Sequence, residues 1–254
     1  MKKIRLWKGC LALLLLTTSC TTHYQVADVK GSRVIVDKRY DAALDQEALT
    51  FLAPYKQQVD SVMGPVVGVV ACDMVADRPE SKLSNLLADI LVWAGKFYNE
   101  QPVLGVYNMG GIRAALTKGE VTYGDVLDVA PFENKICFIT LSGAKLLELF
   151  QQMAQTGGEG VSKGVEMVIT KDHQLVSVRL HGKEIDPAAS YRVTTIDYLL
   201  QGNDKMTAFR DGTDIVSPTE DSNNSRYIII NYFKEKQKMG EVVDAKIEGR
   251  IVVR

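Results

Sequence analysis

The chain has 254 residues, of which 46% are hydrophobic and 24% are charged. These fractions are typical of a globular protein with a proper core, and together with the lack of low-complexity tracts they exclude an intrinsically disordered chain. The formal net charge is −1 at pH 7, so there is no excess of positive charge to attract a nucleic acid polymer. Neither an internal repeat nor a linker divides the sequence, which predicts one domain.

The N-terminus has the layout of a bacterial lipoprotein signal. Four basic residues precede a short apolar run over 11–16, and small residues lead to Cys20. We expect removal of residues 1–19, lipidation of Cys20 as a membrane anchor, and a location in the bacterial cell envelope, on the periplasmic side or at the surface. The alternative is ordinary cleavage that leaves Cys20 unmodified. The mature chain would carry a net charge of −5, with a tether over 20–39 and a domain over 40–254.

Hydrophobic periodicity predicts the elements of that domain. In chain order they are a strand over 33–40, a helix over 44–59 that Pro54 kinks or splits, a strand over 65–74, a helix over 81–99, a strand over 102–108, a short helix starting near Thr122, a strand over 135–143, a helix over 144–156, strands over 164–170, 175–182 and 191–200, a helix over 225–237 and a strand over 246–254. Strands and helices mix without regular alternation. The predicted fold class is therefore α/β (mixed α+β), a layered mixed sheet with helices.

Cysteine spacing gives no metal site. Cys72 and Cys137 each lie in an apolar, strand-like run, and the sequence has no CxxC motif and no Cys/His cluster. Two buried free thiols are the simpler interpretation, and a disulfide in an oxidising compartment is the alternative.

The most informative segment is YNMGGIR, residues 107–113, at the end of a predicted buried strand. Gly110 and Gly111 allow the backbone to approach a ligand closely, Asn108 offers both a donor and an acceptor, and Arg113 supplies a planar fork for phosphate, carboxylate or paired hydroxyls. Strand exits are also where open α/β sheets bind ligands. The alternative is a plain glycine turn with a solvated arginine.

Phe132 follows Pro131 in a predicted loop between two apolar elements. An aromatic ring held in a loop by a proline can stack on a base, although such a residue more often covers the core. By itself this position does not decide between the two roles.

Four segments together resemble a known family. They are ESKLSNLLADIL, NMGGIR, GEVTYGDVLDVAPFENKICFITLSGAKLLELF and LHGKEIDPAASYRVTTIDYLLQGNDKM. In this order they are similar to the C-terminal, substrate-binding domain of the 5'-nucleotidase / UDP-sugar hydrolase family. The resemblance extends from about Tyr40 to the C-terminus, and it implies a domain that recognises a nucleotide or nucleoside.

The resemblance assigns roles to individual residues. Asn108 and Arg113 would bind the base or sugar, Gly110 and Gly111 would give close backbone access, and Phe132 would form one side of an aromatic clamp.

Three further positions follow from the same resemblance. Asn85 would help to line the site, and Asp204 and Met206 in GNDKM would match the family's Gly-Gly-Asp-Gly stretch and the clamp aromatic after it. The sequence departs from the family here, because a methionine replaces the second aromatic ring. Ser84 also replaces a glycine, and Arg78 stands two rather than three residues before Glu80.

No catalytic or metal-binding residue is predicted. The family carries its two-metal chemistry on a separate N-terminal metallophosphatase domain, which needs several His, Asp and Asn ligands. The three histidines here, His23, His173 and His181, form no such grouping. We therefore expect no cofactor in this chain and divalent metals on a partner metallophosphatase.

Three functions follow as hypotheses. The first is the substrate-recognition half of a split 5'-nucleotidase in extracytoplasmic nucleotide catabolism, acting with a separate metallophosphatase subunit. The second is a non-enzymatic nucleoside- or nucleotide-binding lipoprotein, with Met206 or Tyr198 closing the pocket. The third is a scaffold whose pocket has decayed.

Overall fold

A computed structural model describes residues 24–35, 37–39 and 44–254. The predicted signal segment over 1–19 and the lipidated Cys20 lie outside the described residues, so both stay predictions.

Two compact units divide the chain, Met1–Phe51 and Leu52–Arg254. The described residues of the first unit are exposed, and positions 33–35 and 37–39 form no strand, so the strand predicted over 33–40 is wrong at these positions. The helix α2 (Gln46–Met63) is continuous through Pro54 and is not split there. Within α2 no residue is buried.

The second unit contains three sheets. Its helices are α3 (Lys82–Ala94), α4 (Tyr123–Val129), α5 (Gly143–Gln155), α6 (Asp197–Leu200) and α7 (Ser225–Lys238). Its strands are β1 (Val66–Val70), β2 (Leu104–Tyr107), β3 (Gly119–Thr122), β4 (Ile136–Ser142), β5 (Gly160–Val161), β6 (Val165–Ile169), β7 (Leu175–Leu180), β8 (Lys183–Glu184), β9 (Ser190–Ile196), β10 (Thr213–Val216) and β11 (Ile251–Val253). Short 3-10 helices are η2 (Gly95–Phe97), η3 (Met109–Gly111), η4 (Thr207–Asp211) and η5 (Asp221–Asn223).

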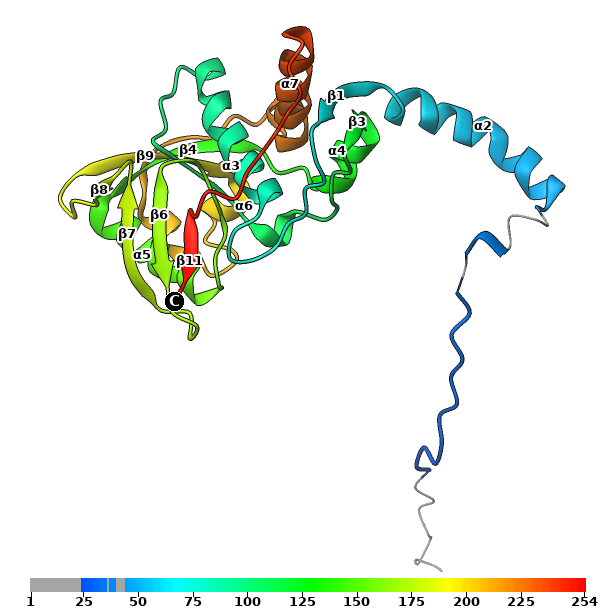
Figure 1. Cartoon of the computed structure of the whole chain (residues 1–254), viewed down its shortest axis with the longest axis horizontal. Helices are drawn as coiled ribbons and strands as arrows, with labels where there is room; N and C mark the ends of the chain where they lie inside the picture. Colours follow the sequence, from blue (N-terminus) through cyan, green and yellow to red (C-terminus); the bar gives the residue numbers. More distant parts are fainter. Residues whose placement is uncertain (1–23, 36, 40–43) are drawn as a thin grey trace, which may run out of the picture. The chain divides into compact units, whose positions relative to one another are not determined.

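The central sheet has the strand order β10-β4-β9-β2-β5. β2 runs parallel to β9, whereas the other pairs in this sheet are antiparallel, so the sheet is mixed. A second sheet has the order β11-β6-β7-β8, and β1 pairs with β3 in a third. Figure 1 shows the second sheet and α7 on opposite sides of this unit. This arrangement confirms the predicted mixed α/β class.

The core lies between the central sheet and the helices α3 and α5. β4 buries an almost continuous apolar run, as expected for a strand covered on both faces, and Phe138 and Phe150 are fully buried. Ser81 begins α3 by accepting from the backbone N–H of Ser84, and the Ser84 hydroxyl accepts in return from the Ser81 N–H.

Cys72 and Cys137 are both free. Cys137 is buried, and this burial raises the pKa of its thiol far above the usual range. Cys72 is partly buried beside the Lys82 ammonium, 3.2 Å away. The disulfide alternative is therefore not supported.

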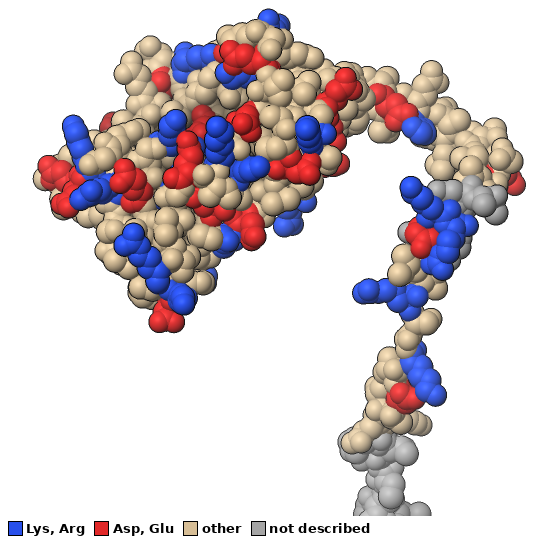
Figure 2. All heavy atoms as spheres, in the orientation of Figure 1, with Lys and Arg blue, Asp and Glu red and all other residues tan. Residues whose placement is uncertain are grey.

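No helix in the described part of the chain is long and apolar enough to cross a membrane. Figure 2 shows Lys and Arg side chains interspersed with Asp and Glu over the visible face of the second unit.

Candidate functional site

The candidate site lies where β2 ends in the central sheet. β2 is buried along its whole length, between β9 and β5, and it leads directly into Asn108 and η3. The backbone turns here through two bonds, from Gly111 N–H to Asn108 O (3.0 Å) and from Ile112 N–H to Met109 O (3.1 Å). The predicted glycine turn at a strand exit is therefore present as a single 3-10 turn.

A pocket of about 250 Å³ opens beside this turn. Its lining residues are Asn108, Gly110, Gly111, Arg113, Phe132, Asn134, Tyr198 and Asp204. Six of the eight residues assigned to a ligand site from the sequence are among them, although they come from segments almost one hundred residues apart.

Asn108 is the buried polar centre of the pocket, with 3% of its surface exposed. Its Nδ2 donates to Asp204 Oδ2 at 2.6 Å. Its Oδ1 has no hydrogen-bond partner and is fully buried. A buried acceptor without a donor is costly, which marks the Asn108 amide as the incompletely satisfied polar group of the pocket wall.

Asp204 links Asn108 to Tyr198. The Tyr198 hydroxyl donates to Asp204 Oδ1 at 3.0 Å, and this bond, with a smaller contribution from burial, raises the pKa of the phenol. Asp204 and Lys205, in the same loop, both adopt positive φ angles, 52° and 65°. The three side chains form one connected network along the pocket wall.

Arg113 and Phe132 form the outer part of the pocket. The Arg113 guanidinium carbon lies 5.4 Å from the centroid of the Phe132 ring, within cation–π range. Phe132 is 43% exposed, so part of its ring is open to a ligand. Arg113 also donates from its backbone to Val129 O at the end of α4, which ties the two segments together.

Two residues assigned to the site from the sequence do not line it. Asn85 is buried in α3, where its Nδ2 donates to Glu80 Oε1 (2.7 Å) and to Lys246 O (2.9 Å). Met206 is fully buried in the core. Tyr198 supplies the second aromatic ring of the pocket instead, from a position eight residues earlier in the chain.

Asn134 was not assigned from the sequence. It follows Phe132 by two residues, and its backbone carbonyl accepts from Ser225 N–H (2.7 Å), which holds this loop against the start of α7. Its proximity to Phe132 is the one sequence signal that could have pointed to it.

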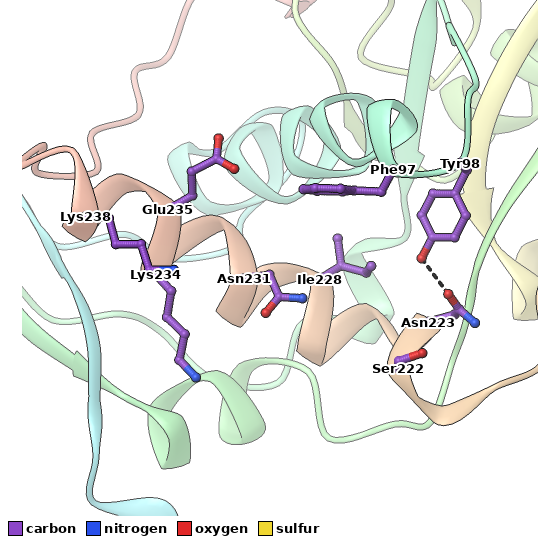
Figure 3. Close-up of a pocket in the computed structure, with 9 residues that line it drawn as sticks. All are labelled: Phe97, Tyr98, Ser222, Asn223, Ile228, Asn231, Lys234, Glu235 and Lys238. Carbon is purple, nitrogen blue, oxygen red and sulfur yellow. Dashed lines mark hydrogen bonds between the residues drawn. The ribbon is translucent and has the colours of Figure 1, made fainter.

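A second hollow of about 510 Å³ lies along α7 (Figure 3). Its one buried polar side chain, Asn223, is satisfied by the Tyr98 hydroxyl (2.7 Å) and by Glu220 (2.8 Å). Unlike the strand-exit pocket, this hollow presents no buried donor or acceptor for a ligand.

The described residues contain no group of three or more His, Cys, Asp or Glu side chains that could hold a metal ion. His173 and His181 each lie in a turn flanking β7, both with positive φ.

Fold and pocket together define an α/β domain whose candidate site lies at the exit of a central strand. The chain belongs to the family described as 5'-nucleotidase, C-terminal domain, whose family model matches residues 66–211. This family membership confirms the resemblance seen in the sequence.

Known proteins of this kind are much longer than the chain. "Trifunctional nucleotide phosphoesterase protein YfkN" of Bacillus subtilis (strain 168) is 28% identical over 224 residues, which is 81% of this chain and 15% of that protein. "Cell wall protein Lmo0130" of Listeria monocytogenes is 26% identical over 225 residues, 78% of this chain and 28% of that protein. The chain thus spans less than a third of these two relatives.

A solved structure shows the same fold. The 5'-nucleotidase precursor from Thermus thermophilus superposes with a TM-score of 0.70 and 28% sequence identity, covering 82% of this chain and 43% of that one.

Proposed function

We propose that the strand-exit pocket binds the base and ribose of a nucleoside or nucleotide. The observation that carries this proposal is Asn108 Oδ1, a buried acceptor at the pocket with no donor on the protein. Base amines and ribose hydroxyls supply such donors. Phe132 offers an exposed ring face for stacking, and membership of the 5'-nucleotidase family supports a ligand of this class.

Charge orients the ligand in the pocket. The Asp204 carboxylate would repel a phosphate at the inner wall, whereas Arg113 stands at the outer wall as the cation among the lining residues. We therefore infer that the base and ribose lie toward Asn108 and Asp204 and that any phosphate lies toward Arg113 and solvent.

For hydrolysis, we propose that a separate metallophosphatase subunit acts on the exposed phosphate. Support comes from membership of the 5'-nucleotidase family and from the open position of Arg113. We further propose that the protein is lipid-anchored through Cys20 in the cell envelope. The N-terminal sequence pattern supports the anchor, and the name of the Listeria relative supports the location.

The binding proposal is tested by calorimetric titration of the full chain with AMP, adenosine and uridine. Arg113→Ala should weaken AMP binding by about tenfold, because a charge-assisted contact to the phosphate is lost. Adenosine, which has no phosphate, should lose less. Arg179→Ala is the matched control, since Arg179 is exposed on β7 and away from the pocket. Flat heats with all three ligands would contradict the proposal and favour a decayed site.

A second candidate function is nucleoside or nucleotide capture without hydrolysis. The Tyr198–Asp204–Asn108 network favours it, because this chain alone holds the pocket's inner wall in place before a ligand arrives. Micromolar binding by the isolated chain would support capture. Metal-dependent hydrolysis only on adding a metallophosphatase would support the split enzyme.

A further inference from the structure

Glu159 is a buried carboxylate next to the pocket that the proposed function does not use. It is 1% exposed and lies between α5 and β5 in the sequence TGGEG. The glycines around it allow this segment to lie against the rest of the unit. A Cβ at Gly158 would stand 2.5 Å from Pro79 O, and one at Gly160 would stand 2.8 Å from Tyr107 O.

The two oxygens of Glu159 join two separate segments. Oε2 accepts from the backbone N–H of Met109 at 2.6 Å, and Oε1 accepts from Arg78 Nη2. Met109 is the first residue of η3, where the backbone N–H has no acceptor within its own turn. Glu159 therefore supplies the missing acceptor at the residue directly after Asn108.

This hydrogen bond fixes the backbone at the start of η3, and the position of the Asn108 side chain in the pocket depends on that backbone. Asn108 must hold its side chain between Asp204 and the ligand, and its position is determined by the peptide that connects it to Met109. The charge of Glu159 adds strength to that bond, because hydrogen bonds to a carboxylate are shorter and stronger than those between neutral groups. Arg78, in turn, holds the carboxylate in place from the other side.

We propose that Glu159 is a positioning residue for the ligand pocket, one that fixes the Asn108–Met109 peptide and so the buried amide that receives the ligand. The inference rests on the proposed function of that pocket. It assigns no contact between Glu159 and the ligand itself.

The substitution Glu159→Gln tests this role in the full chain. A carboxylate offers two acceptors, whereas glutamine offers one acceptor and one donor, so either Met109 N–H or Arg78 must then face an N–H group. AMP affinity should fall by about tenfold, the loss of one charge-assisted hydrogen bond. Glu166→Gln is the matched control, because Glu166 is exposed on β6.

Two further measurements separate positioning from a general loss of stability. In Glu159→Gln the amide hydrogen of Met109 should exchange faster, while the amides of β4 should keep their wild-type rates. The unfolding midpoint should stay within about 3 °C of wild type. Affinity equal to that of Glu166→Gln would overturn the inference, and so would faster exchange throughout β4.

Failure of the proposed function gives a different result. If the wild-type chain binds no AMP, adenosine or uridine, the function proposed for the pocket fails. The hydrogen-exchange rate of the Met109 amide then tests the positioning role of Glu159 by itself. Faster local exchange in Glu159→Gln supports the anchoring of this peptide, and an unchanged rate overturns it.

Discussion

Gly110 and Gly111 are neighbours in the sequence, but a side chain would meet different surroundings at each. A Cβ at Gly111 would stand 2.6 Å from Asn108 Oδ1, and Asn108 cannot easily withdraw because it is buried and bonded to Asp204. A Cβ at Gly110 would stand 3.6 Å from its nearest neighbour, Asp204 Oδ2, an ordinary contact.

We therefore expect Gly111→Ala to lower the free energy of unfolding by about 1–3 kcal/mol through overpacking. Gly110→Ala should change it by about 0.5 kcal/mol or less, since alanine restricts the unfolded chain without strain in the native state. Urea unfolding of both variants measures the difference. Equal losses would show that the space around Asn108 does not determine the requirement for glycine.

Burial raises the pKa of Glu159 above its ordinary value of 4.5, although the Met109 N–H and Arg78 oppose this shift. Between pH 4.5 and the higher native pKa, the native state binds more protons than the unfolded state. Stability from this group therefore falls as the pH rises through that window. A hydrogen bond with the Thr156 hydroxyl also opposes the shift.

The predicted effect is seen by comparison with Glu159→Gln, which cannot ionise. The free energy of unfolding of wild type minus that of Glu159→Gln should decrease as the pH rises above 4.5 and then become constant. Urea unfolding at several pH values gives this difference, with Glu166→Gln as a variant that should follow wild type. An increase with pH would mean that Arg78 outweighs burial.

At this scale the sequence pointed to pocket residues in two ways, through one short motif and through the family likeness, which added Phe132 and Asp204. Asn108, Gly110, Gly111 and Arg113 form one short motif at a strand exit. The chemistry of these four residues was enough to predict a ligand site there. The sequence offered Tyr198 only as an alternative to Met206 and did not indicate Glu159, because both reach the site through tertiary contacts. Family likeness placed Met206 at the ligand, but its side chain is used by the core.

Among the elements, the C-terminal segment depends on a single buried arginine. Arg250 is 5% exposed and donates to Asp89 (2.8 and 2.9 Å), to Glu248 and to the Val161 carbonyl (2.8 Å). These bonds hold the residue directly before β11 against α3, through Asp89, and against β5, through Val161.

We expect Arg250→Met to lower the free energy of unfolding by about 3 kcal/mol, because two carboxylates and a buried carbonyl lose their donor. Lys163→Met is the matched control, since Lys163 is 79% exposed and lies 3.7 Å from the same Glu248. It should cost about 0.5 kcal/mol or less. Thermal unfolding of both variants checks the prediction, which a loss of similar size in each would refute.

Element prediction from periodicity succeeded for long, strongly patterned segments such as α3, α5 and β4. It missed the short strands β3, β5, β8 and β10, because two to four residues give too little alternation and their partners are distant in the sequence. The strand predicted over 191–200 ends at Ile196 and continues as α6, where Tyr198 enters the pocket. Such short changes of direction are decided by tertiary contacts.

At the scale of the whole molecule, the described unit matches only part of the longer proteins it resembles. The chain spans 15% and 28% of the two curated relatives and 43% of the Thermus chain. In the proposed split enzyme, another subunit would carry the metal chemistry, while this chain supplies binding energy through the base and ribose. Such a division predicts that neither component alone shows the full activity.

Phosphate release from AMP tests this division. We expect the full chain with Mg²⁺, Mn²⁺ or Zn²⁺ to release no more phosphate than the metal alone. A secreted metallophosphatase from the same organism should gain about tenfold or more in kcat/KM when the chain is added, because binding of the base and ribose then positions the phosphate. Arg113→Ala should reduce that gain, and Arg179→Ala should not. Metal-dependent hydrolysis by the chain alone would refute the split, whereas tight AMP binding without any gain would identify capture as the function.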